Sequence, residues 1–434
     1  MPRRPAAARS QRGLDERLPL NRLDLKHTMA EASNNWRLER LAALSSGKAN
    51  DARDVVFTFN QESWKDAVGA GMYMSGARLL ASLMSEPSVR RLLVANPYRS
   101  TPIQWARRLS GQRPVPFPAS VRRALIEPRR LRRRDPTSVR ALERVYDAYD
   151  RILESSAASL GFDRPAVITT NPFVAGFSPL RWADRVTFYA WDDWPSGLPV
   201  RRWWTAYEEA FARIRDTGRA VVGVSQAILE RIQPTGAKAV VPNGVAPEEW
   251  RQPAEPPAWF AELRSPKIVY VGALTAERLD VEALSETAVR FSHGSVVLLG
   301  PIVDRAPLDP LRKHPNVLVH APVGRAEVAS VIHAADVCIM PHRLNRLTMA
   351  MSPLKLYEYL AAGRPVAASD LPAVRAVDPR IVLVQEGSSF AEGVEEALSR
   401  GPLSEDDRLA FIEANSWARR HDQILRVAFG SSAA

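Results

Sequence analysis

Short apolar runs alternate with stretches of helical spacing along most of the chain, and the alternation is most regular after residue 267. Short runs rich in β-branched residues, separated by helices of about a dozen residues, predict βαβ units around a parallel sheet. The strands expected in this half lie within 267–274, 295–302, 316–323, 336–341 and 364–369, and helices lie within 280–291 and 324–336.

The first half repeats the alternation less regularly. Strands are expected within 54–60, 89–97, 165–172, 185–194, 220–232 and 238–245, and helices within 71–86 and 138–159. A Pro-rich segment at 246–260 joins the halves. We therefore predict two doubly wound α/β domains that face each other, with a ligand in the cleft outside the carboxyl ends of the strands.

The expected domain boundaries follow from these patterns. They are an extension at 1–50, partly disordered because it has little periodicity, a first domain at 51–248, a second at 249–414, and an amphipathic helix within 415–434.

Length and composition agree with two soluble domains. A chain of 434 residues is too long for one ordinary core, and its 46% hydrophobic and 25% charged residues are typical of globular proteins. No apolar run reaches the roughly 18 residues that span a bilayer. The basic start of the chain lacks the apolar region of a secretory signal, and the single cysteine, Cys338, reads as a buried small hydrophobe. These features favour the cytoplasm.

The net charge of +11 suggests an anionic partner. The densest basic run spans 121–136 and contains Arg122, Arg123, Arg129, Arg130, Arg132, Arg133 and Arg134. An anionic membrane or polyanionic acceptor and a solvated face both remain open as explanations. Nucleic acid is the weaker interpretation because no recognised nucleic-acid motif accompanies the run.

The segment "MSPLKLYEYLAAGRPVAAS" at 351–369 carries the most specific signal. Ser352 is a suitable N-cap, Pro353 suits the first helical position, and Gly363 suits a left-handed end, so a helix at 353–362 is expected. Its N-terminus follows a strand and would attract a phosphate. Lys355 and Glu358 would face that ligand, although a surface Lys–Glu pair worth about 0.2–0.5 kcal/mol is the alternative.

Two other segments complete the pattern: "YVGALTAERLD", which places Gly272 and Arg278 after a strand, and "VVPNGVAPEEW" around Asn243. From about residue 221 onward the chain resembles the retaining GT-B glycosyltransferases of glycosyltransferase family 4, especially cell-envelope and polysaccharide members with a Pro-Leu-Lys-Leu-Tyr-Glu-Tyr run. The first domain is similar only in outline and in "FYAWDDWPSG" at 188–197.

The resemblance implies that the second domain binds a nucleotide-diphosphate sugar and the first binds an acceptor, while the last helix crosses back to the first domain. It places Glu358 at the ribose, and Arg278 and Lys355 at the diphosphate. Two residues usual in the family are replaced, by Ala273 and Ala350, so His342, Arg343, Asn345 or backbone amides at 350–353 would hold the sugar instead. The donor-site residues expected in this way are Gly272, Arg278, His342, Asn345, Ser352, Pro353, Leu354, Lys355 and Glu358.

The acceptor side is expected in the first domain. Asp192 and Asp193 end an apolar run, and because neighbours on an extended chain point oppositely, one of them would reach the substrate; a turn or helix cap is the alternative. Trp191 and Trp194 would stack on a sugar or pack inside. The acceptor-side residues are Trp64, Gly71, Trp191, Asp193, Trp194 and Asn243, and the catalytic ones are Asp192, Asp193, Arg278 and Lys355.

These observations predict a glycosyltransferase that works with retention in cell-envelope glycan synthesis. No metal or other cofactor is expected, because Arg278, Lys355 and a helix N-terminus would neutralise the diphosphate. The acceptor would be a glycan, a lipid-linked molecule or a small molecule, and the protein a cytoplasmic one, peripheral at the membrane if the basic run docks there. A sugar-nucleotide epimerase of the same fold and a non-catalytic polyanion- or membrane-binding protein are the alternatives.

Overall fold

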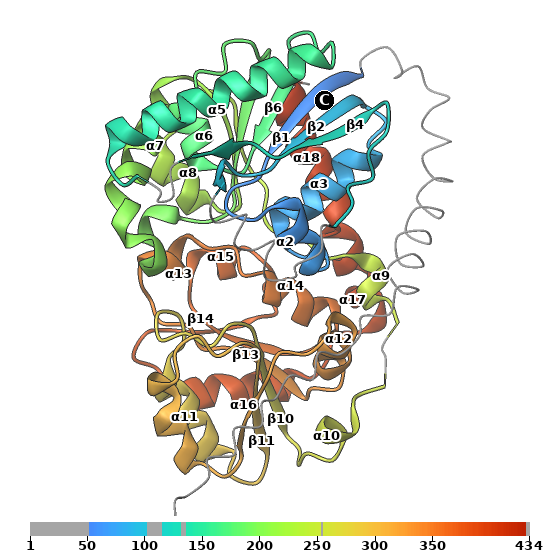
Figure 1. Cartoon of the computed structure of the whole chain (residues 1–434). Coiled ribbons are helices and arrows are strands. Elements are labelled where there is room, and N and C mark those ends of the chain that lie inside the picture. The colour runs from blue at the N-terminus through green and yellow to red at the C-terminus, as the bar shows by residue number, and fades with distance from the viewer. Residues whose placement is uncertain (1–51, 102–114, 132–135, 253–254, 431–434) are drawn as a thin grey trace, which may run out of the picture. The chain divides into compact units, whose positions relative to one another are not determined.

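The structure is a computed structural model of the chain, and it describes residues 52–101, 115–131, 136–252 and 255–430. Residues 51–434 form one compact unit. The extension predicted at 1–50 lies outside the described residues, as do Arg132, Arg133 and Arg134 of the basic run. Within the unit, two main parallel sheets are each covered by helices (Figure 1).

The first sheet has seven strands in the order β4-β2-β1-β6-β7-β8-β9, and every neighbouring pair is parallel. The strands are β1 (Arg53–Thr58), β2 (Val89–Ala95), β4 (Arg123–Ile126), β6 (Ala166–Thr169), β7 (Arg185–Ala190), β8 (Ala220–Gly223) and β9 (Lys238–Val240).

Helices cover both faces of the first sheet because alternate strand residues point to opposite sides. Val55 and Phe57 of β1 pack with α3 and α18, whereas Val56 packs with α5. The helices of this half are α2 (Trp64–Gly69), α3 (Ser75–Ser85), α5 (Val139–Ser159), α6 (Pro172–Phe177), η2 (Trp194–Ser196), η3 (Leu198–Trp203), α7 (Trp204–Asp216) and α8 (Gln226–Ile232), and α18 (Trp417–Phe429) joins them from the end of the chain.

Two expectations for the first half need correction. The helix predicted at 71–86 begins only at Ser75, because Gly71 and Met72 have left-handed φ angles of 69° and 55° that end the preceding turn. Within the basic run, where no strand was expected, the structure has strand β4 and the two-residue β5 (Arg129–Arg130), which pairs with β3 (Arg99–Ser100). Part of the basic run therefore lies in strands: β4 is the edge strand of the first sheet, and β5 belongs to a separate two-stranded sheet with β3.

The second sheet has six parallel strands in the order β12-β11-β10-β13-β14-β15. They are β10 (Lys267–Val271), β11 (Ser295–Leu299), β12 (Val317–His320), β13 (Val337–Met340), β14 (Val366–Ser369) and β15 (Val382–Val384). The predicted strands of this half are confirmed, and Cys338 is fully buried in β13.

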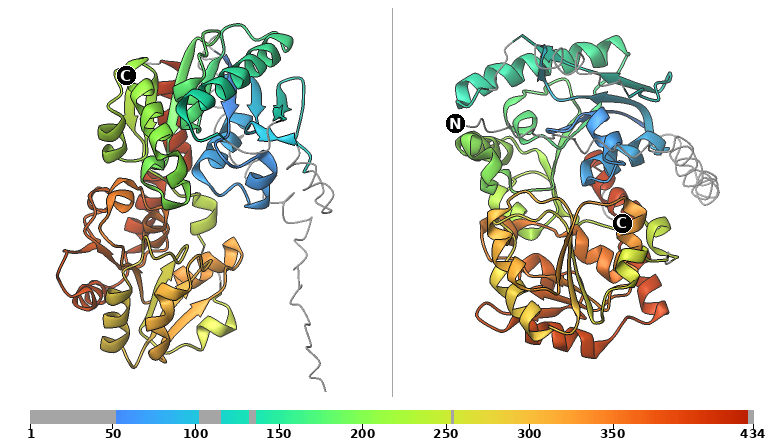
Figure 2. Two further views of the ribbon diagram at one scale, coloured as in Figure 1. Left: turned by 60° about the vertical axis from the view of Figure 1, so that its left-hand side comes forward. Right: turned by 60° about the horizontal axis from the view of Figure 1, so that its bottom comes forward.

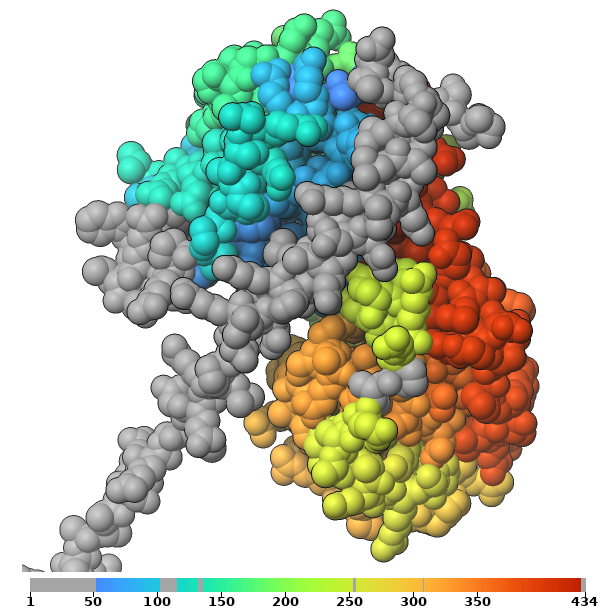
Figure 3. Space-filling view, turned by 90° about the vertical axis from the view of Figure 1, so that its right-hand side faces the viewer, coloured from blue at the N-terminus to red at the C-terminus, as the bar shows by residue number. Residues whose placement is uncertain are grey.

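The helices of the second half pack on its two faces, with α12 and α14 on one and α11 and α16 on the other. They are α9 (Pro247–Trp250), α10 (Ala258–Ala261), α11 (Val281–Arg290), η4 (Ala306–Lys313), α12 (Arg325–His333), α13 (Arg346–Ala350), α14 (Leu354–Ala361), α15 (Pro372–Arg375), α16 (Phe390–Arg400) and α17 (Glu405–Ala414). Figure 3 shows the yellow-green joining segment on the surface, over orange and red parts of this half.

The chain returns to the first half at its end. Helix α18 buries Trp417, Ile424, Leu425 and Ala428, and it lies against β6, β7, β8 and β9 of the first sheet. The views of Figure 2 show this red helix beside the first sheet from two directions. The expected return of the last helix is therefore confirmed, whereas the domain boundaries at 248 and 414 stay a prediction.

Candidate active site

Helix α14 lies where the sequence predicts it, but its start is built differently. It begins at Leu354 after Pro353, and no side chain caps it. Ser352, the predicted N-cap, instead accepts a hydrogen bond from the Asn243 N–H at 3.3 Å and gives its carbonyl to Asn243 Nδ2 at 2.7 Å. The N-cap prediction for Ser352 is wrong because this residue ties the helix to the first half, whereas its contact with the nucleotide sugar stays a prediction. Gly363, with φ at 73°, follows the helix as expected.

The ammonium of Lys355 lies at the carboxyl end of strand β10. Its Nζ donates to Tyr270 Oη at 2.8 Å, lies 3.3 Å from His342 Nε2, and is 4.1 Å from the centroid of the Tyr270 ring. Gly272 follows the strand with φ at 141°, and a Cβ built there would lie 2.9 Å from Lys355 Nζ. A glycine at 272 therefore leaves the room that the ammonium occupies.

Burial changes the pKa values of the ionisable side chains around Lys355. Burial of the ammonium, assisted by the charge of Arg278, lowers the pKa of Lys355 to about 7. Burial and the same two cations hold the pKa of His342 well below its ordinary range, so the imidazole is neutral. An anion brought to this place would therefore meet one permanent positive charge and one that a proton can restore.

Arg278 is positioned by its own loop. Its N–H donates to the Thr275 carbonyl at 3.2 Å, and its carbonyl accepts from the Arg343 N–H at 2.8 Å. In the described part of the chain, neither Arg278 nor Lys355 forms an ion pair. We call Tyr270, Arg278, His342 and Lys355 the cation cluster.

Asp192 and Asp193 at the end of β7 have different surroundings. Asp193 is 2% exposed, pairs with Arg231 at 3.0 Å, and accepts a hydrogen bond from Ser196 Oγ. Asp192 is half-buried; burial raises its pKa, and the charge of Arg278 partly offsets that rise. The Asp192 carboxylate feels the charge of Arg278 and accepts a hydrogen bond from the Asp193 N–H at 2.9 Å. Asp193 is held by Arg231, so the catalytic and acceptor-side role predicted for Asp193 is corrected to an internal ion pair.

The acceptor-side prediction for Trp64 is also wrong. Its side chain is 5% exposed, donates from Nε1 to the Pro116 carbonyl at 3.3 Å, and meets the Phe117 ring edge-on at 5.0 Å. Trp64 thus belongs to the hydrophobic core of the first half. Gly71 is exposed in the loop before α3, where its positive φ serves the turn.

Trp191 and Trp194 contact each other, which favours the packing alternative for both. Their rings form an edge-to-face pair with centroids 5.2 Å apart, and Trp194 lies 6.1 Å from the Tyr207 ring. Both remain half-buried, so their contact with an acceptor stays a prediction.

The two asparagines of the prediction are engaged with the protein. Asn345 caps α13 by accepting from the Thr348 N–H at 3.0 Å and donates to the Glu277 carbonyl at 2.6 Å. Asn243 is buried and accepts from Ser75 Oγ at 2.8 Å. Both shape the loops around the site, and the sugar contact predicted for Asn345 requires that its hydrogen bonds be exchanged.

Glu358 is 2% exposed and takes part in a second group of charges. Its Oε1 accepts from Arg325 at 2.7 Å and from Tyr73 Oη at 3.2 Å. Arg325 also pairs with Glu249 at 2.7 Å, and Glu249 pairs with Arg78 at 2.7 Å. We call these five residues the paired cluster. A surface Lys–Glu pair on α14 is excluded, because Glu358 is buried with other partners.

Sequence reasoning found only Glu358 among the members of the paired cluster. Tyr73 and Arg78 come from the first half, Glu249 from the joining segment, and Arg325 from the start of α12. No periodicity or spacing relates segments so far apart. A weak signal existed in the acidic first turn of α9, since a carboxylate next to a buried tryptophan needs a cation.

No group of three or more His, Cys, Asp or Glu side chains in the described part of the chain could hold a metal ion. No helix among these residues has the length and apolar character needed to cross a membrane.

Residues 265–400, which contain the cation cluster and Glu358, match the family described as "Glycosyl transferases group 1". Over 98 residues the chain is 32% identical to a protein of Bacillus subtilis (strain 168) named as a teichuronic acid biosynthesis glycosyltransferase, TuaH. That match covers 22% of this chain and spans 25% of the relative.

Solved structures resemble nearly the whole chain. A sucrose-phosphate synthase from Thermosynechococcus elongatus is 14% identical with a TM-score of 0.60, covering 88% of this chain and 100% of that one. A UDP-forming alpha,alpha-trehalose-phosphate synthase from Burkholderia vietnamiensis gives 13% and 0.59, covering 87% and 100%. A lipopolysaccharide outer core galactosyltransferase gives 13% and 0.57, also covering 87% and 100%. At these identities the likeness establishes the fold, which is GT-B with two Rossmann-like halves.

Proposed function

We propose that this protein is a glycosyltransferase that moves a sugar from a nucleotide-diphosphate sugar to an acceptor hydroxyl in cell-envelope glycan synthesis. The observation that carries the proposal is the cation cluster: the ammonium of Lys355 lies at the carboxyl edge of the second sheet, the charge of Arg278 acts on it, and neither cation forms an ion pair among the described residues. Ligands of doubly wound sheets bind at this edge. Positive charge without a protein partner suits a diphosphate.

Transfer of the sugar requires positive charge beside the diphosphate that leaves. As the bond between the anomeric carbon and the diphosphate oxygen breaks, negative charge grows on that oxygen, and Arg278 and a protonated Lys355 would stabilise it. The acceptor oxygen bonds to the anomeric carbon and loses its proton. Asp192, whose pKa is raised by burial, would orient that hydroxyl and accept the proton.

Retention and membership of family 4 rest on the resemblance of the late motif, and the anomeric configuration of the product measured by NMR tests retention. The names of the matched proteins support a sugar-nucleotide donor and a cell-envelope product.

We propose further that the diphosphate is neutralised by the cation cluster without a metal. Transfer should then persist in EDTA, and loss of transfer in EDTA with recovery on adding Mg²⁺ or Mn²⁺ would contradict this assignment.

Peripheral association with the inner face of the membrane through the basic run is proposed on charge alone. Arg122 donates to the carbonyls of Val89 and Arg90 at 2.7 and 2.8 Å, and Arg129 pairs with Glu127 at 3.1 Å, so part of the run serves the sheet. Co-sedimentation with anionic liposomes across a salt series, for the wild type and a variant with Arg132, Arg133 and Arg134 changed to Ser, tests the rest.

The decisive experiment is nucleotide release from UDP-, GDP- and dTDP-sugars, with and without membrane extracts as a source of acceptor. We expect one nucleotide class to bind, and its release to be accelerated by acceptor. An epimerase would convert the donor without releasing nucleotide, and a non-catalytic protein would leave every donor unchanged.

A further inference from the structure

The loop between helices α13 and α14 belongs to the second half of the chain, but residues of the first half hold its carbonyl groups. Ala350 ends α13 and Leu354 begins α14, and we call the residues from 350 to 353 the α13–α14 loop. Ser225 Oγ donates to the Ala350 carbonyl at 2.5 Å. Asn243 Nδ2 donates to the Ser352 carbonyl at 2.7 Å.

Both of these first-half residues are themselves fixed in place. Ser225 is 5% exposed and caps α8, because its Oγ accepts from the Ile228 N–H at 3.3 Å. Asn243 is 6% exposed, its Oδ1 accepts from Ser75 Oγ at 2.8 Å, and its carbonyl accepts from Arg420 Nε at 3.3 Å. The two hydrogen-bond donors that reach the α13–α14 loop therefore have positions set by the first half.

The carbonyl contacts determine where an N–H group of the loop points. In a trans peptide the carbonyl and the following N–H point in opposite directions. The Ala350 carbonyl is directed to Ser225, so the next N–H is directed away from this serine. Several N–H groups from this peptide to the first turn of α14 have no acceptor among the described residues. They are those of Met351, Ser352, Leu354 and Lys355.

The free N–H groups adjoin the cation cluster. Lys355 belongs to both, because its N–H lies in the first turn of α14 and its Nζ lies at the carboxyl end of β10. Free N–H groups at the start of a helix attract anions, and the ammonium of Lys355 has no ion-pair partner in the described part of the chain. A diphosphate has enough oxygens to contact the N–H groups and the ammonium together.

We infer that Ser225 and Asn243 are positioning residues of the donor site. They hold carbonyl groups of the α13–α14 loop toward the first half and thereby keep its free N–H groups directed to the diphosphate. Each residue acts through the loop and not by contact with the donor. The inference rests on the proposed function, because it concerns the donor that the cation cluster would bind. The donor site of the second half is then fully ordered only while the first half contacts it.

Two substitutions remove these hydrogen bonds while keeping neighbouring contacts. Asn243→Asp keeps an acceptor for Ser75 but places an oxygen where Nδ2 donates to the Ser352 carbonyl. Ser225→Ala removes the hydroxyl, and Ser225→Thr restores it. The probe is inorganic pyrophosphate, measured by calorimetry on the full chain. We expect Asn243→Asp and Ser225→Ala to bind it about threefold to tenfold more weakly, the factor for one hydrogen bond, and Ser225→Thr to bind it as the wild type does.

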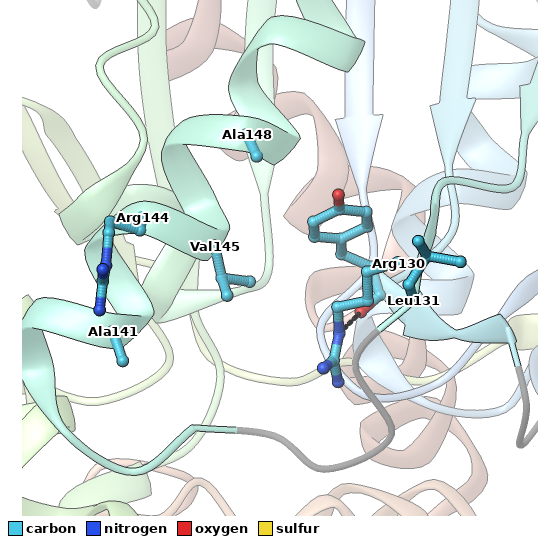
Figure 4. A pocket seen from close by; sticks show the side chains of 7 residues that line it. Arg130, Leu131, Ala141, Arg144, Val145 and Ala148 are labelled. Atoms are coloured by element: carbon cyan, nitrogen blue, oxygen red, sulfur yellow. Dashed lines mark hydrogen bonds between the residues drawn. The ribbon is translucent and has the colours of Figure 1, made fainter.

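Two control variants separate positioning from other effects. Ser225→Ala also loses the cap of α8, so Ser404→Ala is the matched control. Ser404 Oγ accepts from the Asp407 N–H at 3.1 Å and donates to the carboxylate of the same residue at 2.7 Å, within α17. Both serine variants should lose stability, but only Ser225→Ala should lose affinity. Arg144→Glu is the second control, because Arg144 lines a separate cavity between α5 and β5 where pyrophosphate can also be attracted (Figure 4).

Three results would overturn the inference: no binding of pyrophosphate to the wild type, unchanged binding in Ser225→Ala and Asn243→Asp, or an equal loss in Arg144→Glu. UDP-, GDP- and dTDP-sugars are measured on the same samples. A wild type that binds pyrophosphate through the α13–α14 loop but binds no sugar nucleotide would count against the glycosyltransferase proposal alone. Sugar-nucleotide binding that is equal in the wild type and both variants would count against the positioning role alone.

Discussion

Helix α14 contributes one residue to the paired cluster and one to the cation cluster, and these two residues lie one turn apart. The charges are balanced within one cluster and not within the other. Glu358 belongs to the paired cluster, where two arginines meet two carboxylates and the formal charge sums to zero. Lys355 belongs to the cation cluster, where two cations and a neutral imidazole meet no ion-pair partner among the described residues. The charges of the paired cluster therefore balance one another, whereas those of the cation cluster are left for a ligand to balance.

The difference shows how one helix can combine stability with binding. A buried charge is costly unless it is paired, and the paired cluster meets that condition with partners from both halves of the compact unit. The cation cluster does not meet this condition, and the lowered pKa of Lys355 reflects the cost of burying an unpaired ammonium. Uncompensated charge at the carboxyl edge of a sheet is therefore the stronger pointer to function here, even though Glu358 resembles a family motif.

The largest effect is expected on stability, from Arg325→Met in the paired cluster. Glu358 would keep only Tyr73, and an uncompensated buried carboxylate costs about 3–5 kcal/mol. Arg290→Met is the control, because Arg290 pairs with Glu395 on the surface and exposed pairs of this kind contribute little to stability. Urea denaturation measures both. A loss below about 1 kcal/mol in Arg325→Met would mean that the paired cluster does not hold the halves together.

The next effect concerns Asp192 and Asp193, neighbours with opposite surroundings. Asp192→Asn should slow transfer by about a hundredfold, the lower end for a general base, while donor binding and stability stay the same. Asp193→Asn should remove the buried partner of Arg231, which would keep only its pair with Glu208, and should lower stability. Steady-state transfer rates and thermal melts of both variants separate the roles. Equal loss of transfer in the two variants would return Asp193 to the catalytic site.

Lys355→Met tests the cation cluster itself. Donor binding should weaken by about tenfold to a hundredfold, the value of a hydrogen bond to a charged partner. Stability should not fall, because methionine fills similar space without the cost of a buried charge. Calorimetry with the preferred sugar nucleotide, together with urea denaturation, provides the measurement. A variant that binds donor normally would remove Lys355 from the donor site.

The sequence predicted most of the fold because its signals are local. Strand β10, helix α14 and the glycine at 363 each follow from residues within one short window. The two cations of the cation cluster were predictable for the same reason, since Arg278 and Lys355 lie near the ends of predicted elements. These positions meet because parallel strands bring their carboxyl ends to one edge.

The remaining features depend on contacts that no local pattern records. The hydrogen bond between Tyr73 and Glu358 joins residues 285 positions apart. Ser352 is of a residue type that commonly caps helices, yet its hydroxyl and carbonyl oxygens accept hydrogen bonds from Asn243 of the other half. Trp64 follows a strand as a ligand-binding aromatic would, but Phe117 covers it. In each case a tertiary partner decided between two roles that the local sequence allowed equally.

The smallest effect expected is a pH dependence that only the cation cluster should produce. The pKa of Lys355 is about 7 in the protein without ligand, and a bound diphosphate would raise it, so the protonated form is the one that binds. Affinity should be full below about pH 6, and it should fall by at most about tenfold per pH unit as pH rises through 7. His342 stays neutral across this range because its pKa is held far lower.

A sugar nucleotide is the correct probe for this pH dependence, since its phosphodiester oxygens do not titrate near neutrality. Calorimetry in buffers of different ionisation enthalpy should show uptake of up to one proton on binding near pH 8. Lys355→Met supplies the control, because its weaker binding should be independent of pH over the same range. If the wild type binds with equal affinity from pH 6 to pH 9, the lysine is protonated throughout, and the cation cluster carries its full charge before any ligand arrives. The contrast with the paired cluster would then rest on the absence of carboxylates and not on the proton of Lys355.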